Sequence, residues 1–380
     1  MKKILVVHNK YQNIGGEDAN IFDEIDQLKL SYQVEYIEYD NSIKLNIFDL
    51  IGFFTKNNLL SNLRLKKKLK NFQPNIVYIH NTWFKANLGI FKILKSNEAK
   101  VYLKLHNFRY NCSRFFLASN HVESENFCKA CNFKNENKYF NKYYDNSYLK
   151  SFFLILYSKK LFKIIQSSEI KILLITDFHK EFLNKLGVDS SKLFIYYNPI
   201  NLPKVNIQKR NLSNYFIYAG RVEYEKGVDM LLETWTKAEL KEFSLKIIGS
   251  GILLQELKNR FNSKNIEYLG EISNSRVLTE ISNARAVVTA TMLYEGQPRL
   301  LCEASSLGVP SIFPSFGGMI EFFPDNYELS YEQYNYIDLF EKLNILTNDE
   351  AVLKSGVEVK EFIDEKLNKN KLKEIFNNIN

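Results

Sequence analysis

Two carboxylates lie on either side of a predicted helix start between residues 289 and 304, where the sequence reads TATMLYEGQPRLLCEA. Pro298 suits the first position of a helix because the N–H that proline lacks is not needed there. We therefore expect a helix from Pro298 to about Gly308, whose N-terminus offers free N–H groups to phosphate oxygens. Glu295 in the preceding loop and Glu303 in the helix could accept hydrogen bonds from different hydroxyls of one ligand. The alternative is a pair of solvated surface acids.

A second charged motif, upstream of the first, is basic. Residues 218–227 read YAGRVEYEKG, which predicts a strand, a turn at Gly220 and Arg221, and a helix over Val228–Thr236 that follows Lys226 and Gly227. Arginine offers a planar fork of donors and lysine a compact point charge. Together they could neutralise a diphosphate leaving group. Two exposed basic residues without a function are the alternative.

The N-terminal half contributes glycines and histidines. Gly15 and Gly16 lie between a predicted strand and a predicted helix, where glycine lets the backbone approach a ligand; a plain tight turn is the alternative. His80 and His106 each end a predicted strand. An imidazole at that position can orient a hydroxyl near a reacting centre. A single histidine in such a place can equally be structural.

Three of the four cysteines, Cys112, Cys128 and Cys131, follow His106 in the sequence. The spacing of Cys128 and Cys131 suits metal binding by thiolates, and Cys112 with a fourth ligand could complete a tetrahedral site. The second Cys-x-x-Cys pair of a zinc ribbon is missing. The sequence is therefore compatible with a structural metal or with a metal-free loop. A disulfide scaffold is not expected in so long a chain without an export signal.

Alternating strands and helices must position these residues. Apolar runs that predict strands recur through both halves of the chain, separated by helical stretches such as 19–30 and 180–186. This alternation predicts parallel sheets with crossover helices and hence an α/β fold. The predicted strands are Ile4–His8, Val34–Tyr39, Ile76–His80, Lys100–Leu105, Ile170–Thr176, Leu193–Tyr197, Tyr215–Tyr218, Leu245–Ile248, Ile266–Leu269, Ala286–Ala290 and Ser311–Phe313.

The two prolines of Asn198–Pro203 interrupt this alternation and predict an interdomain linker. We expect an N-terminal domain over residues 1–198, a second α/β domain over 205–355, and a helical tail over 356–380 that could cross back to the first domain. Two open sheets in tandem predict a cleft between the domains, with ligand sites at the carboxyl ends of the strands.

Composition limits the class of protein and its partners. The 380 residues with 45% hydrophobic content indicate a globular protein of two-domain length. Without an apolar run of about 18 residues or a secretory signal, a cytoplasmic protein is expected. The net charge of +8 favours acidic partners such as nucleotides or an anionic membrane surface. Nucleic acid is not expected as a partner, because no zinc-finger, basic-zipper or RNA-binding pattern is present.

Two stretches bear on membrane contact. Leu63–Lys70 concentrates positive charge, and Phe152–Tyr157 leads into the basic residues of 159–163. Both kinds of segment suit the anionic face of a bilayer, so the first could hold the protein on the inner face of the cytoplasmic membrane. A solvated helix face is the alternative for the first stretch. For the second we favour a helix of the domain core.

The segment from Glu295 to Glu303 resembles the Glu-x7-Glu motif of the retaining glycosyltransferases of family 4, which have the GT-B fold. Residues 220–227 resemble the Gly-Arg…Glu-Lys-Gly pattern of the same family. The resemblance covers most of the second half of the chain and the first half only loosely. It implies two Rossmann-like, doubly wound domains that face each other across a cleft. Some members of that family carry a similar His…Cys…Cys-x-x-Cys run, which suggests a local structural staple.

The resemblance also implies roles for individual residues. Glu303 would hold the ribose hydroxyls of a nucleoside diphosphate, and Glu295 would contact the donor sugar near the reacting centre. Arg299 stands where many relatives carry an apolar residue. The implied catalytic residues are His106 and Glu295, and the implied donor-binding residues are Gly15, Gly16, Arg221, Lys226, Gly296, Gln297, Pro298, Arg299, Leu300 and Glu303.

The implied activity is transfer of a sugar, with retention at its anomeric carbon, from a nucleoside-diphosphate donor to a glycan or lipid-linked acceptor. Cell-surface polysaccharide synthesis, such as that of O-antigen, is the implied setting. No cofactor is required, although a structural metal in the cysteine loop is compatible with the sequence. A nucleotide-sugar epimerase, a phosphorylase of the same fold and a non-catalytic transferase-like binding subunit are the alternatives. The donor sugar, the acceptor and the linkage stay open.

Overall fold

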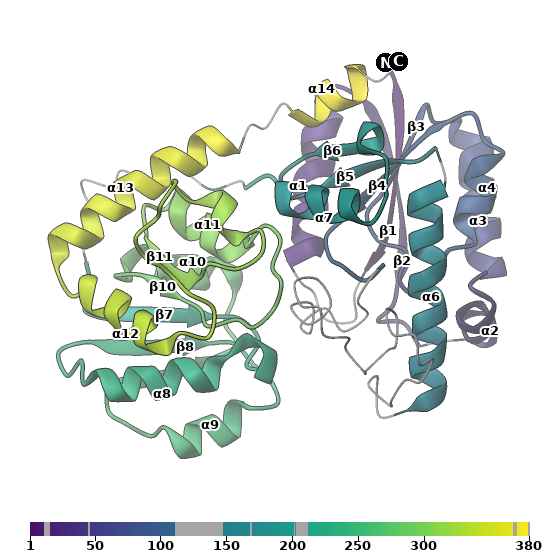
Figure 1. Cartoon of the computed structure of the whole chain (residues 1–380). Coiled ribbons are helices and arrows are strands. Elements are labelled where there is room, and N and C mark those ends of the chain that lie inside the picture. Colours follow the sequence, from purple (N-terminus) through teal and green to yellow (C-terminus); the bar gives the residue numbers. More distant parts are fainter. Residues whose placement is uncertain are drawn as a thin grey trace. The chain divides into compact units, whose positions relative to one another are not determined.

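The computed structural model describes residues 1–10, 16–44, 46–110, 147–167, 169–200, 202, 212–367 and 371–378, with the backbone alone for 16–20 and 378. Contacts divide the chain into two compact units (Figure 1). Unit 1 consists of Met1–Pro199 and Lys369–Asn380, and unit 2 consists of Ile200–Asn368. Within the described residues, no helix is long and apolar enough to cross a membrane.

Unit 1 is built on a six-stranded parallel sheet with the strand order β2-β1-β3-β4-β5-β6. Its strands are β1 (Lys3–Lys10), β2 (Gln33–Asp40), β3 (Ile76–Ile79), β4 (Lys100–Leu105), β5 (Lys171–Leu174) and β6 (Leu193–Ile195). Its helices are α1 (Gly16–Lys29), α2 (Ile47–Thr55), α3 (Leu59–Phe72), α4 (Ile90–Lys95), α6 (Tyr148–Ser167), α7 (Asp177–Lys185) and α14 (Lys371–Asn378).

Both faces of this sheet are covered by helices. The four consecutive apolar residues of Ile4–Val7 in β1 are all fully buried, as expected for a strand with a helix layer on each side. On one face, α1 and the C-terminal α14 share a core, in which Ile25 and Phe376 are both buried. Tyr32 donates a hydrogen bond to Asn377 Oδ1 at 3.0 Å, so the end of the chain is fastened to unit 1.

Unit 2 is a second parallel sheet, with the strand order β12-β11-β10-β7-β8-β9. Its strands are β7 (Tyr215–Ala219), β8 (Ser244–Ile248), β9 (Ile266–Gly270), β10 (Val287–Val288), β11 (Ser311–Pro314) and β12 (Ser330–Tyr331). Its helices are α8 (Val228–Ala238), α9 (Leu254–Arg260), α10 (Asn274–Asn283), α11 (Arg299–Ser306), α12 (Tyr336–Ile345) and α13 (Asp349–Lys366).

The α/β class with two parallel sheets is confirmed. The predicted tail, however, began at residue 356, which lies in the middle of α13. This helix belongs to unit 2, where Lys360 donates a hydrogen bond to the carbonyl of Ser306 in α11 at 3.2 Å. The segment assigned to unit 1 begins at Lys369. The polar pattern of α13 does not reveal which unit it covers, because that depends on contacts distant in sequence.

Candidate functional site

Two loops meet at the carboxyl edge of the sheet in unit 2. β7 and β10 are neighbours, and the strand order reverses between them, since β8 continues outward from β7 and β11 from β10. Open α/β sheets bind ligands at such reversal points. The loop after β7 carries Arg221 and Lys226, and the loop after β10 carries Glu295. Met292 donates its N–H to the carbonyl of Glu225 at 2.9 Å, which joins the two loops.

The close approach of these loops depends on a glycine. Gly227 has a φ of +61°, and a Cβ at this position would lie 2.0 Å from the carbonyl oxygen of Ala290. Glycine tolerates the left-handed conformation and has no Cβ to collide. The Lys-Gly pair therefore ends the first loop in a conformation that lets Lys226 reach the second.

Lys226 and Glu295 form an ion pair across the two loops. The lysine Nζ lies 2.5 Å from Glu295 Oε1, and the Thr291 hydroxyl lies 3.3 Å from the same oxygen. The two charged side chains are 21% and 26% exposed. Because they are neither fully buried nor freely solvated, a ligand can reach both. The ammonium group can contact a phosphate oxygen while the carboxylate accepts a hydrogen bond from a hydroxyl.

Arg221 is also paired with acids. Its guanidinium contacts the Glu223 carboxylate and lies 3.9 Å from that of Glu225. Burial, and then a hydrogen bond with Glu225, raise the pKa of Glu223 above its usual value. The basic residues predicted from the motif therefore do not stand alone at this edge. A diphosphate would have to displace these carboxylates in order to contact Arg221 and Lys226.

α11 begins one residue later than predicted. Pro298 is the N-cap, with an extended backbone, and its carbonyl accepts the N–H of Cys302 at 3.0 Å. The helix ends at Ser306, and Gly308 follows with a φ of +71°. Gln297 before the helix is buried. Burial raises the pKa of the Cys302 thiol, which argues against a role as a nucleophile at neutral pH.

Glu303 lies inside this helix and is only 3% exposed. Arg299, one helical turn earlier, donates from Nε to Glu303 Oε1 at 2.8 Å. Arg299 thus has a role that its sequence position did not reveal. A charge-assisted bond of this kind holds a carboxylate in one orientation.

A third loop supports Glu295 from the other side. Gly318 donates its N–H to the carbonyl of Glu295 at 3.1 Å, and the rings of Phe316 and Tyr294 lie 4.2 Å apart. Sequence reasoning missed this loop. The signal that could have found it is the Gly317–Gly318 pair, which follows β11, the strand next to β10.

In unit 1, the two predicted histidines are in contact. His80 follows β3 and His106 follows β4, and the two strands are neighbours in the sheet. His80 Nδ1 lies 3.4 Å from His106 Nε2, within hydrogen-bonding distance. His80 is almost fully buried, whereas His106 is partly exposed. His106 is therefore the member of the pair that a ligand can reach.

Behind His80 lies a buried ion pair that the sequence analysis did not predict. Lys104 in β4 and Glu24 in α1 are both fully buried, and their charged groups are in contact. Tyr78 donates its hydroxyl to Glu24 Oε2 at 2.6 Å, and His80 Nε2 lies 3.5 Å from the same oxygen. A row of polar groups thus leads from Glu24 through His80 to His106.

The environment keeps both imidazoles neutral. Burial, and then the proximity of His106 and of the Lys104 ammonium, lower the pKa of His80 well below its usual value. Burial, followed by the charge of Lys104, does the same for the pKa of His106. At neutral pH each ring therefore has one nitrogen that donates and one that accepts a hydrogen bond.

A small cavity of about 40 Å³ opens at the carboxyl ends of β3 and β4. His106, Trp83 and Arg109 are among the residues that line it. The guanidinium of Arg109 lies 5.9 Å from the centre of the Trp83 ring. The volume is sufficient for a water molecule or a single hydroxyl group.

Residues 203–364 match the family Glycosyl transferases group 1. Unit 2 carries a glycosyl transferases group 1 domain. The matched segment includes the two loops at the reversal point and the whole of α11. A curated relative, the amylovoran biosynthesis glycosyltransferase AmsD of Erwinia amylovora, is 28% identical over 151 residues, which cover 37% of this chain and 42% of that protein. The match thus spans less than half the length of the relative.

Solved structures show that the chain that contains the group 1 domain has the GT-B fold. Sucrose-phosphate synthase from Thermosynechococcus elongatus superimposes with a TM-score of 0.72 at 11% identity, over 100% of this chain and 99% of that one. HepE from Anabaena, in complex with UDP and glucose, has a TM-score of 0.65 at 12% identity, with 100% of both chains covered. The predicted fold is confirmed.

Within the group 1 domain, the structure brings together most of the predicted donor-binding residues. Arg221 and Lys226 come from the first loop, Glu295 from the second, and Arg299 with Glu303 from the helix that follows. Gly296, Gln297, Pro298 and Leu300 belong to the same loop-helix segment. His106 lies in unit 1 and does not belong to this group.

Several other predicted residues fall outside what the structure describes. Gly15 and the three cysteines Cys112, Cys128 and Cys131 lie outside the described residues. Gly16 is the first residue of α1. Among the described residues, no group of three or more His, Cys, Asp or Glu side chains could hold a metal ion. The structural metal in the cysteine loop stays a prediction.

Proposed function

We propose that this protein is a retaining glycosyltransferase of family 4 that moves a sugar from a nucleoside diphosphate to a glycan or lipid-linked acceptor. The observation that carries the proposal is the Lys226–Glu295 ion pair beside the start of α11. The pair joins a cation and a carboxylate at a reversal point of the sheet, and Glu295 lies in the loop that leads into α11. These groups suit a diphosphate and an attached sugar.

The donor contacts follow from this arrangement. Arg221 and Lys226 would exchange their carboxylate partners for diphosphate oxygens, and so offset the charge that develops as the sugar–phosphate bond breaks. Glu295, released from Lys226, would accept a hydrogen bond from a hydroxyl of the donor sugar. Glu303, held by Arg299, would accept hydrogen bonds from the ribose hydroxyls. The positive charge comes from side chains and helix amides, so we propose a reaction that requires no metal.

In unit 1, His106 would contact the acceptor. If His80 carries its proton on Nε2 and directs it toward Glu24, His80 Nδ1 can accept a hydrogen bond from the Nε2–H of His106. His106 then presents Nδ1 as an acceptor for a substrate hydroxyl. Glu24 and His80 are positioning residues in this scheme, because they act through His106.

Cell-surface polysaccharide synthesis is the proposed setting, supported by the partial match to the amylovoran glycosyltransferase. UDP is the first nucleotide to test, since HepE of the same fold binds UDP. The sequence resemblance to the family supports retention of anomeric configuration and a front-face attack.

The test compares turnover of a panel of UDP-sugars by the wild type, Glu303→Ala and Glu256→Ala. Glu256 is an exposed acid of α9 in the same unit, and so serves as the control. We expect donor hydrolysis or transfer by the wild type and the control, and a loss of about 100-fold or more in Glu303→Ala. Equal turnover by all three proteins would refute the assignment. Release of an epimer without acceptor, or a requirement for free phosphate, would identify an epimerase or a phosphorylase instead.

A further inference from the structure

The helix α2 in unit 1 turns large apolar side chains outward and buries a charged residue. Its buried residues are Asp49 and Gly52, a charge and a glycine. Its outward side chains are large and apolar, with exposed fractions from 41% to 63%. A surface helix of a globular protein normally turns such residues toward the core. The outward residues are Ile47, Phe48, Leu50, Ile51 and Phe54.

Local contacts hold α2 in this orientation. Asn46 and Asp49 form a reciprocal capping box, with bonds of 2.9 and 3.0 Å. The buried Asp49 carboxylate also accepts a hydrogen bond from the side chain of Asn58 at 2.8 Å. Phe53, between the two faces, packs against the rings of Trp83 and Phe84. The apolar face is therefore presented by a well-anchored helix.

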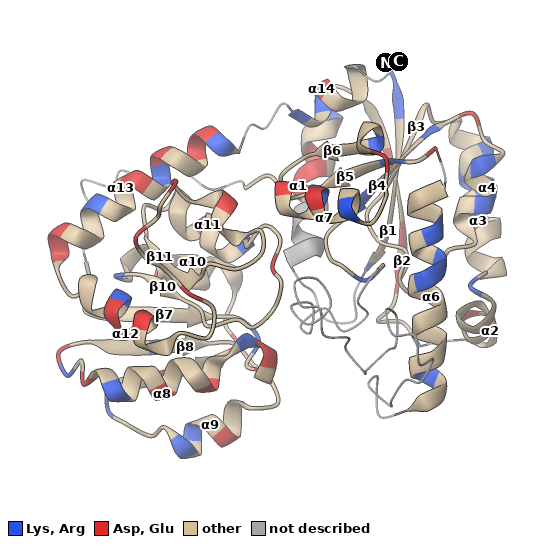
Figure 2. Cartoon of the chain, in the orientation of Figure 1, with Lys and Arg blue, Asp and Glu red and all other residues tan. Residues whose placement is uncertain are grey.

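The neighbouring helix α3 continues the surface and adds charge. Leu59, Leu63, Lys66 and Lys70 are all exposed, and their spacing of four, three and four residues places them on one side of the helix. The opposite side, which includes Leu65, is buried. The stripe begins with two leucines at the end of α3 nearest α2 and continues with two lysines toward the end of α3. Figure 2 shows basic positions in blue on α3.

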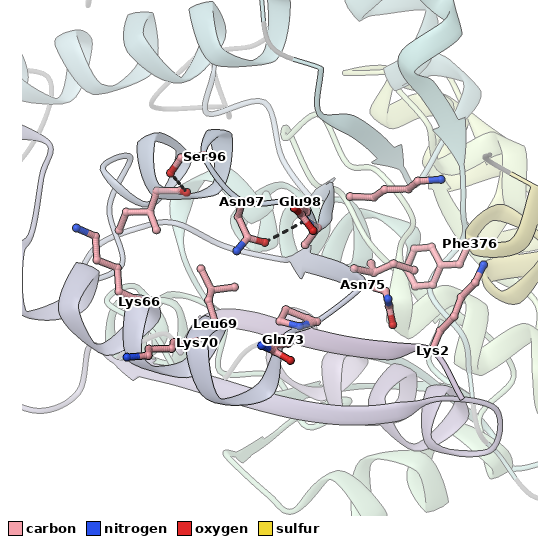
Figure 3. Close-up of a pocket in the computed structure, with 15 residues that line it drawn as sticks. Lys2, Lys66, Leu69, Lys70, Gln73, Asn75, Ser96, Asn97, Glu98 and Phe376 are labelled. Atoms are coloured by element: carbon pink, nitrogen blue, oxygen red, sulfur yellow. Dashed lines mark hydrogen bonds between the residues drawn. The ribbon is translucent and has the colours of Figure 1, made fainter.

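The basic end of the stripe borders a wide hollow at the amino ends of β1, β3 and β4 (Figure 3). The hollow has a volume of about 890 Å³, and Lys66 and Lys70 line it together with Lys2 and Lys100. The region from residue 41 to residue 73 contains seven Lys or Arg residues and a single acid, the buried Asp49. Glu98 also lines the hollow, so the four lysines leave a net positive charge beside the apolar part of the surface.

We propose that α2 and the exposed side of α3 form a lipid-facing surface that binds the face of an anionic bilayer. The apolar side chains of α2 would enter the boundary between headgroups and acyl chains, and the lysines of α3 would contact lipid phosphates. Charge complementarity favours a lipid over a protein partner, because protein–protein interfaces are depleted in lysine. The binding needs no donor or acceptor, so it goes beyond glycosyl transfer and can be tested without it.

The test measures co-flotation of the full-length protein with vesicles of phosphatidylcholine, with and without phosphatidylglycerol. We expect the wild type to bind the vesicles that contain phosphatidylglycerol, and to be released by salt. The double variant Phe48→Ser/Ile51→Ser removes apolar contacts, and Lys66→Gln/Lys70→Gln removes two charges. Each should lower binding about tenfold or more, because buried apolar area and basic charge both contribute to binding at the interface.

Matched controls change exposed apolar residues and exposed lysines elsewhere on the surface. Ile337→Ser/Leu353→Ser alters two exposed apolar residues of unit 2, and Lys237→Gln/Lys354→Gln alters two exposed lysines of unit 2. Both controls should bind like the wild type. The proposal is overturned if the wild type does not bind, or if controls and test variants bind equally. A dimer in solution that Phe48→Ser/Ile51→Ser dissociates, without vesicle binding, would assign the face to a second copy and likewise overturn it.

Discussion

Among its described residues, unit 2 has two lysine–glutamate pairs of similar geometry in different places. Lys226 and Glu295 are 2.5 Å apart at the reversal point, whereas Lys246 and Glu280 are 2.8 Å apart beside α10 and are similarly exposed. We expect Lys226→Gln to lower kcat about 100-fold, because in the proposed reaction it removes a cation that offsets the charge of the leaving diphosphate. Lys246→Gln should leave kcat unchanged. Steady-state turnover of the accepted donor measures both, and equal losses would contradict a role specific to Lys226.

Arg299 offers a second comparison, this time between two ion pairs within helices. Arg299 holds Glu303 at 2.8 Å, and Arg276 lies 4.0 Å from Glu280 at the same i,i+4 spacing. We expect Arg299→Leu to raise the KM for the donor about tenfold while kcat changes little, because Glu303 loses the partner that orients it. Arg276→Leu is the control. A KM that stays constant in both variants would show that Glu303 needs no such support.

At this scale, the sequence reveals the types of residue better than their partners. Glu295 and Glu303 could be singled out because they lie close together in a recognisable motif. Arg299 could not be explained, because its bond to Glu303 depends on the rotamers of both side chains. The contact between Glu24 and Lys104 spans 80 positions in the sequence, so no local sequence pattern predicts it.

At the scale of elements, the turn that ends the first loop can be tested with two glycines. Gly227 and Gly270 have nearly equal φ angles of +61° and +67°, but a Cβ at Gly270 would meet nothing within 4 Å. Gly270→Ala should therefore cost about 1–2 kcal/mol from backbone strain alone. Gly227→Ala should cost more and should also weaken donor binding, because the carbonyl of Ala290 must move. Urea unfolding and donor titration measure the two effects; equal stability and binding in both variants would contradict the close approach of the loops.

The elements themselves were largely predictable, for a physical reason. Strands such as β1 are buried on both faces, so their continuous apolar runs stand out in the sequence. The two-residue strand β12 (Ser330–Tyr331) was missed because it does not lie in an apolar run, whereas the equally short β10 lies within the apolar run 286–290. The surface formed by α2 was also missed, since an apolar stretch is normally read as core and only the burial of Asp49 and Gly52 shows which side faces inward.

At the scale of the whole molecule, stability should depend on pH through the histidines of unit 1. Folding lowers the pKa values of His80 and His106 well below the usual value, and that of His179 to about 3, mainly by burial. Below about pH 6.5 the unfolded chain therefore binds up to three more protons than the folded one, and stability falls by up to about 1.4 kcal/mol per pH unit for each histidine. The raised pKa of Glu24 offsets at most one proton.

Denaturant unfolding between about pH 8 and pH 5 tests this dependence. The free energy of unfolding should be nearly constant above about pH 7 and should decline below about pH 6.5. For the variant His179→Gln, the free energy of unfolding should decline less steeply with falling pH, because one proton fewer is taken up on unfolding. Glutamine keeps a hydrogen-bonding group for Tyr110 but does not titrate in this range. The same slope in both proteins would show that His179 is not held neutral in the folded state.

The central claim is that the group 1 domain binds a nucleoside diphosphate through Glu303. Calorimetric titration of UDP and of its 2′-deoxy and 3′-deoxy analogues into the wild type and Glu303→Ala tests it most directly. We predict that the wild type binds UDP about tenfold or more tightly than at least one deoxy analogue, because the carboxylate then loses a hydroxyl partner. Glu303→Ala should bind all three ligands equally and weakly. Equal affinities for all three ligands in the wild type, or no binding of UDP, GDP or ADP at all, would contradict the account.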